Sequence, residues 1–97
     1  MTPDLATVLA AIRARQSEAI ADGFELVGVV GSVARGEAND ASDVDIVYRI
    51  AGSPTLFGLA RTKGNLEDRL GVRVDLVNFA TVPDRIRASL ERDLVVA

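Results

Sequence analysis

The chain of 97 residues contains neither cysteine nor histidine. Without cysteine, disulfides, thiolate-based zinc fingers and thiol catalysis are excluded. Without histidine, Ser–His–Asp triads, HExxH metalloproteases and imidazole acid–base catalysis are excluded as well. A bound metal must therefore have oxygen ligands, which favour hard cations such as magnesium, manganese or calcium.

Positive charge is also scarce. Eleven basic residues against fourteen acidic ones give a net charge of −3, which argues against direct nucleic-acid binding. No apolar run approaches the ~20 residues of a membrane span, and the N-terminus shows no signal-peptide pattern. We therefore expect a cytoplasmic protein that does not associate with membranes. A hydrophobic content of 48% is ordinary for a globular protein, and the length predicts one domain over residues 1–97.

Hydrophobic periodicity predicts alternating helices and strands. Thr2 is a candidate N-cap with Pro3 at the first helical position, and the pair Ser53-Pro54 repeats that signal. The predicted helices cover residues 3–21, a short turn or two within 31–42, residues 53–71, and a last helix starting at 81–84 with a stripe of Ile86, Leu90 and Leu94. The predicted strands cover residues 26–30, 44–50 and 72–79. This order indicates an α/β (α+β) fold with a small sheet flanked by helices.

Gly31 and Ser32 follow directly after the first predicted strand and open the short helix. Backbone N–H groups and a hydroxyl at such a turn can bind phosphate, and glycine lets the phosphate approach the backbone. Taken alone, the pair is more typical of an ordinary turn and helix cap. A P-loop is excluded because no Lys-Ser/Thr follows Gly36.

Three acidic residues change that interpretation. Asp43 and Asp45 are two apart on a predicted strand, so their carboxylates share one face. Their mutual repulsion calls for a cation, and Mg²⁺ binds to a few carboxylates together with substrate phosphates. A solvated edge strand is the alternative interpretation. Asp75 lies between apolar neighbours in the next strand, and it can face the same site if the two strands pair.

These residues carry a resemblance to a known family. The sequence resembles the minimal nucleotidyltransferases of the DNA polymerase β superfamily, whose motif is Gly-Ser, ten residues, then Asp-x-Asp. Gly31-Ser32, residues 33–42 and Asp43-Val44-Asp45 match that motif without a gap. The resemblance spans nearly the whole chain and implies a polymerase-β-like fold with a mixed sheet of three to four strands.

The resemblance also implies roles for residues. Gly31 and Ser32 would contact the nucleotide phosphates, while Asp43 and Asp45 would hold one or two Mg²⁺ ions. Asp75 would complete the metal site and act as base toward an acceptor hydroxyl. Two further residues belong to the expected nucleotide site with less definite roles. Arg35 either neutralises phosphate or is a solvated helix residue, and Ser42 is either a ligand or a local cap.

The subgroup that the sequence resembles implies a function. Its members are antitoxins paired with HEPN-type ribonuclease toxins, and they are thought to transfer AMP from ATP to a tyrosine of the toxin. We therefore expect an Mg²⁺-dependent adenylyltransferase that neutralises a cognate HEPN-type toxin. Two alternatives stay open at this point. The chain could inhibit its partner by binding alone, or it could modify a small molecule in a pocket completed by a partner chain.

Overall fold

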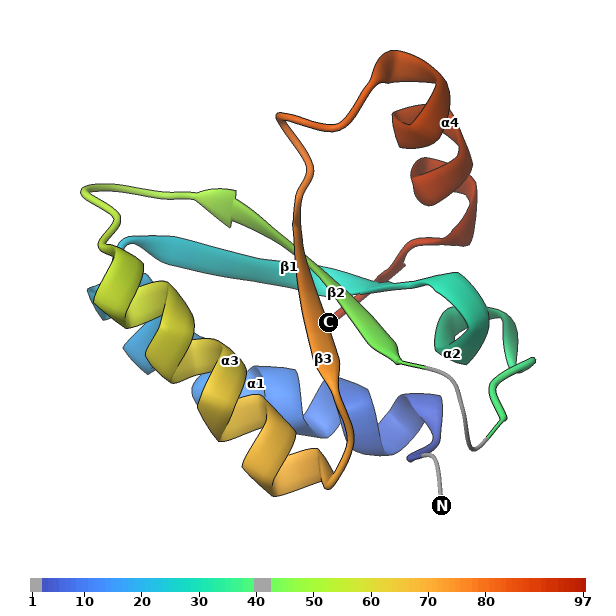
Figure 1. Ribbon diagram of the computed structural model, residues 1–97, viewed down its shortest axis with the longest axis horizontal. Coiled ribbons are helices and arrows are strands. Elements are labelled where there is room, and N and C mark those ends of the chain that lie inside the picture. Colours follow the sequence, from blue (N-terminus) through green and yellow to red (C-terminus); the bar gives the residue numbers. More distant parts are fainter. Residues whose placement is uncertain (1–2, 40–42) are drawn as a thin grey trace.

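The computed structural model describes residues 3–39 and 43–97, in which helices surround a four-stranded sheet (Figure 1). The elements, in chain order, are α1 (Leu5–Ala21), β1 (Phe24–Val30), α2 (Gly31–Arg35), β2 (Val44–Ile50), α3 (Leu56–Leu70), β3 (Val74–Asn78), α4 (Asp84–Asp93) and β4 (Val95–Val96). The strands lie in the order β3-β2-β1-β4. The predicted fold class, a small mixed sheet flanked by helices, is therefore confirmed.

The helix boundaries differ slightly from the prediction. Asp4, not Thr2, caps α1, because its carboxylate accepts a hydrogen bond of 2.8 Å from the Thr7 N–H. Thr2 lies outside the described residues. Thr55, not Ser53, caps α3, and its hydroxyl accepts from the Gly58 N–H at 2.9 Å. In both cases a side-chain oxygen two residues later than expected satisfies the first turn of the helix.

The sheet is mixed. β1 pairs antiparallel with β2 and places Val30 opposite Asp45. β2 pairs parallel with β3, so that Asp45 lies opposite Asp75. Because neighbouring strands are ~4.8 Å apart and register partners share a face, the predicted pairing of these two strands is confirmed.

The strand β4 was not predicted. Leu94 adopts extended backbone and ends α4, so the expected stripe of Ile86, Leu90 and Leu94 does not continue as one helix. The last residues instead pair with β1, with Val96 opposite Gly28. A Cβ at Gly28 would collide with the Val95 carbonyl oxygen. Glycine at this position is therefore what allows β4 to approach β1.

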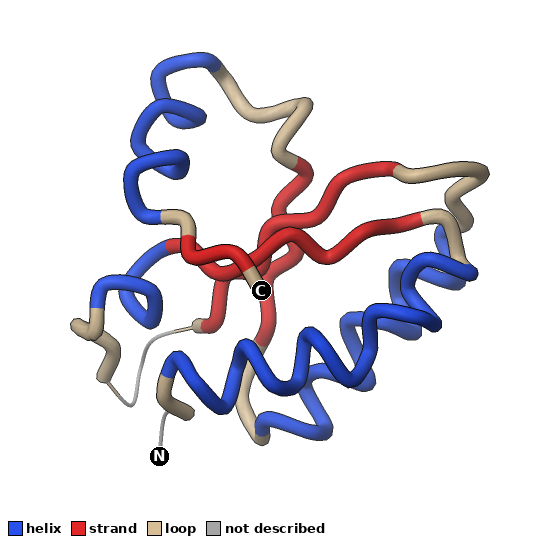
Figure 2. Tube along the Cα trace, turned by 180° about the vertical axis from the view of Figure 1, so that it is seen from behind, coloured by secondary structure: helices blue, strands red, loops and turns tan. Residues whose placement is uncertain are grey.

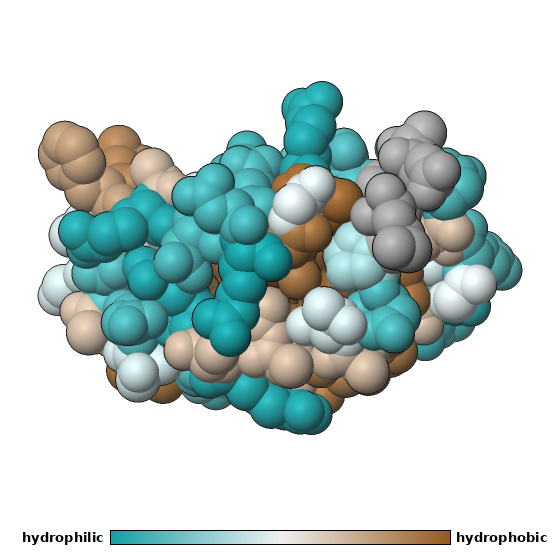
Figure 3. Space-filling view, turned by 90° about the horizontal axis from the view of Figure 1, so that it is seen from below, coloured by the Kyte–Doolittle hydropathy of each residue, from teal (hydrophilic) through white to brown (hydrophobic). Residues whose placement is uncertain are grey.

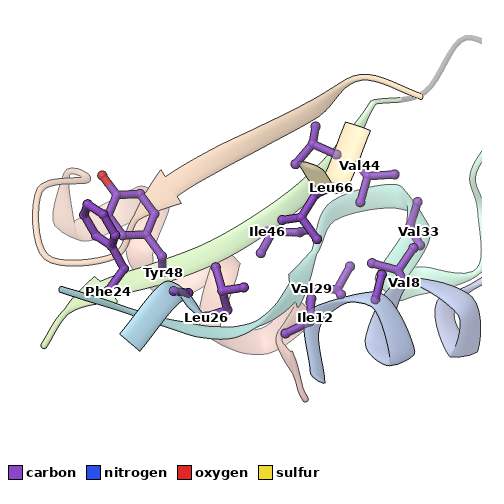
Figure 4. Close-up of a cluster of buried hydrophobic side chains, with 13 residues drawn as sticks. Val8, Ile12, Phe24, Leu26, Val29, Val33, Val44, Ile46, Tyr48 and Leu66 are labelled. Atoms are coloured by element: carbon purple, nitrogen blue, oxygen red, sulfur yellow. The ribbon is translucent and has the colours of Figure 1, made fainter. Parts of the chain in front are cut away.

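The hydrophobic core lies between the sheet and the helices α1 and α3, which cover the same face (Figures 1 and 2). Figure 4 shows side chains from this cluster, which includes Val8, Ile12, Leu26, Val29, Val44, Ile46 and Leu66. Phe24 and Tyr48 close one end with an edge-to-face contact, their ring centroids 5.6 Å apart. None of the described helices is long and apolar enough to cross a membrane.

Candidate active site

The candidate site begins where β1 ends, on the face of the sheet opposite α1 and α3. Val30 is the last strand residue and also the N-cap of α2, so the chain turns from strand to helix within one residue. Gly31 has φ +78°, a value that side chains rarely allow. A Cβ at Gly31 would lie 2.6 Å from the Asp45 carboxylate. Glycine thus keeps open the space between the turn and the acid, and this is where the sequence predicted phosphate binding.

The acidic residues gather on the same face. Asp43 and Asp45 are two residues apart at the start of β2, and Asp75 is the register partner of Asp45 on β3. Asp43 and Asp45 are partly buried, whereas Asp75 is exposed. Within the described part of the chain, none of the three forms an ion pair. The site therefore carries uncompensated negative charge.

The pKa of Asp45 is raised by its burial and by the neighbouring negative charges. Burial raises the pKa of the Asp45 carboxyl above its ordinary value of 3.8, and the charges of Asp75 and Asp43 raise it further. The charge of Arg35 acts in the opposite direction, but it is the smallest contribution. Repulsion of this kind is relieved when a cation binds between the carboxylates.

The donor set fits a hard divalent cation. Asp43 precedes Asp45 by two residues, and Asp75 lies opposite Asp45 on β3. The space between Asp45 and Gly31 is open. No three acidic side chains among the described residues converge closely enough to form a metal site by themselves. Mg²⁺ normally takes one or two carboxylates and completes its shell with water and substrate phosphates. Asp43 and Asp45, with Asp75 beside them, would therefore hold such an ion together with a bound nucleotide.

The other predicted residues differ in their placement. Ser32 is partly buried in the first turn of α2, next to Gly31. The Arg35 guanidinium pairs with Glu37 at 3.0 Å and with Asp93 at 2.7 Å. Arg35 therefore links α2 to the end of α4. In this arrangement its guanidinium N–H groups donate to carboxylates and not to a phosphate. Ser42 lies outside the described residues.

Sequence reasoning missed a cavity on the same face. It has a volume of about 570 Å³ and lies between the sheet and α4, lined by Val27, Arg49, Phe79, Ala80, Arg87 and Leu94. Arg87 fixes its wall by donating to the carbonyl oxygens of Phe79, Ala80 and Val82 at 3.1–3.2 Å. Its guanidinium also lies 5.9 Å from the centre of the Phe79 ring. No local pattern in the sequence signals these contacts, because an arginine on an exposed helix usually points into solvent.

Comparisons with known proteins agree with this geometry. Residues 13–96 match the model of the nucleotidyltransferase domain family. Protein adenylyltransferase MntA of Thermococcus cleftensis is 38% identical over 73 residues, which cover 75% of this chain and 74% of that protein. A candidate protein adenylyltransferase of Methanocaldococcus jannaschii is 33% identical over 70 residues, which cover 71% of each chain.

Two solved structures have the same fold as this chain. A protein described as a minimal nucleotidyltransferase is 40% identical with a TM-score of 0.79, and the match covers 96% of this chain and 95% of the other. A chain from a toxin–antitoxin crystal structure with AMP-PNP has the same fold, with a TM-score of 0.68 at 17% identity, covering 97% of this chain and 72% of that one. Because the family model matches most of the chain and these relatives and structures agree with it, the chain belongs to the nucleotidyltransferase domain family.

Proposed function

We propose that this protein transfers AMP from ATP to a hydroxyl group, most simply a tyrosine, of a HEPN-type ribonuclease toxin and thereby neutralises it in the cytoplasm. The observation that carries the proposal is the register match of Asp45 and Asp75 beside the open turn at Gly31. That arrangement would bring the turn at Gly31 and a cluster of carboxylates within reach of one reacting group. Phosphoryl and nucleotidyl transfer need mainly such positioning and charge neutralisation.

Each residue has a defined task in this reaction. Backbone N–H groups at Gly31 and Ser32 hold the β- and γ-phosphates. Asp43 and Asp45 would hold Mg²⁺, which would neutralise the phosphate charge and the charge that develops on the leaving pyrophosphate. Asp75 accepts the proton of the acceptor hydroxyl as its oxygen attacks the α-phosphorus. A new P–O bond forms to the acceptor, and the bond from the α-phosphorus to pyrophosphate breaks.

Two kinds of finding support a protein acceptor. The relative MntA of T. cleftensis is described as a protein adenylyltransferase, and the M. jannaschii relative as a candidate one. The chain of the same fold in the AMP-PNP structure comes from a toxin–antitoxin complex. The charge pattern of the site supports Mg²⁺ and a nucleoside triphosphate, since un-neutralised carboxylates bind the metal and the metal in turn binds phosphate.

The test is transfer to the protein encoded by the adjacent reading frame. The two chains are mixed with ATP and Mg²⁺, separated, and the partner is weighed by intact-mass spectrometry. We expect the partner to gain the mass of one or more AMP units and to stay inactive as a ribonuclease after the chain is removed. A partner of unchanged mass that recovers full activity would instead support inhibition by binding alone. Transfer to a small molecule but not to the protein would favour the alternative in which the chain modifies a small molecule with the help of a partner chain.

A further inference from the structure

An apolar surface lies next to the candidate active site on the side away from α4. Leu56 and Phe57, the first two residues of α3, are each 86% exposed. Side chains of this size and exposure add nothing to the hydrophobic core. The face of the molecule in Figure 3 is mostly hydrophilic, and hydrophobic side chains protrude at its left end. Adjacent large apolar side chains in full contact with water are typical of surfaces that bind another molecule.

Two hollows connect Leu56 to the sheet. The first, of about 190 Å³, has Ile50 and Pro54 in its wall, and the second, of about 400 Å³, has Ala60 and Leu76. Both hollows contain Leu56 and Leu59. Together they form one continuous surface, in which Lys63 also lines the second hollow. We call its apolar residues the apolar strip: Ile50, Pro54, Leu56, Leu59, Ala60 and Leu76.

The apolar strip ends at the candidate catalytic base. Asp75 lines the second hollow together with Leu76, its neighbour on β3. β3 is the edge strand of the sheet, and its outer side has no strand beside it among the described residues. Asp75 thus faces the acids of β2 on one side and the end of the apolar strip on the other. A molecule seated on the strip therefore lies beside Asp75, because both line the second hollow.

We propose that the apolar strip, with Phe57 beside it, is the docking surface for the protein that receives the nucleotide, and that it delivers the acceptor hydroxyl to Asp75. The proposal rests on the proposed function for the identity of the acceptor. The occupant is a folded partner with an apolar contact surface next to its acceptor residue. Such a surface can cover Leu56 and Phe57 together, whereas a small molecule in either hollow leaves Phe57, which lines neither hollow, exposed.

The experiment uses two variants, Leu56→Asp and Phe57→Asp. Both sites are almost fully exposed, and an acid in the first turn of α3 interacts favourably with the helix dipole, so the fold is retained. The control is Val96→Asp, which makes the same kind of change at a side chain that is 64% exposed on β4, the opposite edge of the sheet. Each variant is assayed for binding to the protein of the adjacent reading frame, for transfer to it, and for ATP binding.

We expect Leu56→Asp and Phe57→Asp to weaken partner binding by at least about tenfold, because a charge replaces an apolar side chain that the partner would bury. Transfer to the partner should fall in parallel, while ATP binding stays within about twofold of the native chain. Val96→Asp should leave all three measurements unchanged. Equal partner binding by the strip variants and Val96→Asp would overturn the docking surface.

The same assay separates this proposal from the proposed function. If the native chain binds its partner but transfers nothing, the proposed chemistry fails. The docking surface is still decided in that case, because the strip variants either lose binding or keep it. If the native chain transfers AMP and the strip variants transfer it equally well, the chemistry stands and the docking surface is wrong.

Discussion

The two faces of strand β2 show how one short segment serves both stability and chemistry. On one face, Val44 and Ile46 are fully buried against α1 and α3. On the other face, Asp43 and Asp45 stay partly accessible and carry uncompensated charge. The helices cover the first face, whereas α4 stands over the second without burying any of its own residues. Val47, further along the second face, is fully buried. The comparison therefore indicates that substitutions of the buried apolar residues should affect mainly stability, and those of the acids on the second face mainly activity.

The largest effect should come from the covered face. Leu66 is fully buried, so Leu66→Ala should cost about 2–5 kcal/mol of unfolding free energy through the cavity it leaves. The matched control is Leu56→Ala, which makes the same change at a side chain 86% exposed and should cost less than about 0.5 kcal/mol. Denaturant unfolding measures both. Similar costs for the two variants would contradict the placement of the core.

The next largest effect should come from the turn. Gly31→Val introduces a Cβ 2.6 Å from the Asp45 carboxylate, so it should weaken ATP binding by at least about tenfold, a loss of about 1.4 kcal/mol. Ser32→Ala removes one hydrogen bond, worth about 1 kcal/mol, and should weaken binding less.

Gly36→Val is the control for backbone strain. Gly36 has a similar φ of +73°, but a Cβ there would meet nothing within 4 Å. Calorimetric titration with ATP measures the three variants. If Gly31→Val and Gly36→Val bind ATP equally well, the space beside Asp45 is not part of the nucleotide site.

A smaller effect should appear in the pH dependence of stability. The folded-state pKa of Asp45 is raised, chiefly by burial, so the folded protein holds its proton more tightly than the unfolded chain. The stability that this carboxyl contributes is therefore present below the unfolded pKa and is lost as pH rises through the folded one. Asp45→Asn should melt at a higher temperature than the native protein at neutral pH, and the difference should shrink as pH falls toward 3.8. A difference that does not vary with pH would show that Asp45 is not destabilised by its surroundings.

The smallest effect should come from the ion pair between Arg35 and Asp93. Both groups are partly solvated, with side-chain exposures of 43% and 23%, so Asp93→Asn should cost at most about 1 kcal/mol. The released Arg35 becomes available for phosphate, and ATP binding should stay equal or strengthen slightly. Weaker ATP binding by Asp93→Asn would mean that the contact between α2 and α4 positions the turn itself.

The covered face was easier to predict than the open one. Strand β2 was predicted with its bounds, because strict alternation of apolar and polar residues specifies both a strand and its buried side. The Gly-Ser and Asp-x-Asp spacing located the candidate site in the same way. The contacts of Arg35 could not be predicted, since its partner Asp93 is 58 residues away. Nor could β4, because two residues carry no pattern and their pairing depends on the missing side chain of Gly28.

The most direct test of the account is one variant measured in two ways. Asp45→Asn should reduce transfer of AMP to the partner by at least about a hundredfold, the scale of losing one group that stabilises charge in a transition state. The same variant should melt at or above the temperature of the native protein, because it removes a repelled charge. The control Asp68→Asn, at an exposed acid of α3, should change neither measurement. Transfer within tenfold of the native rate, or a marked loss of stability, would contradict the assignment of this face to chemistry.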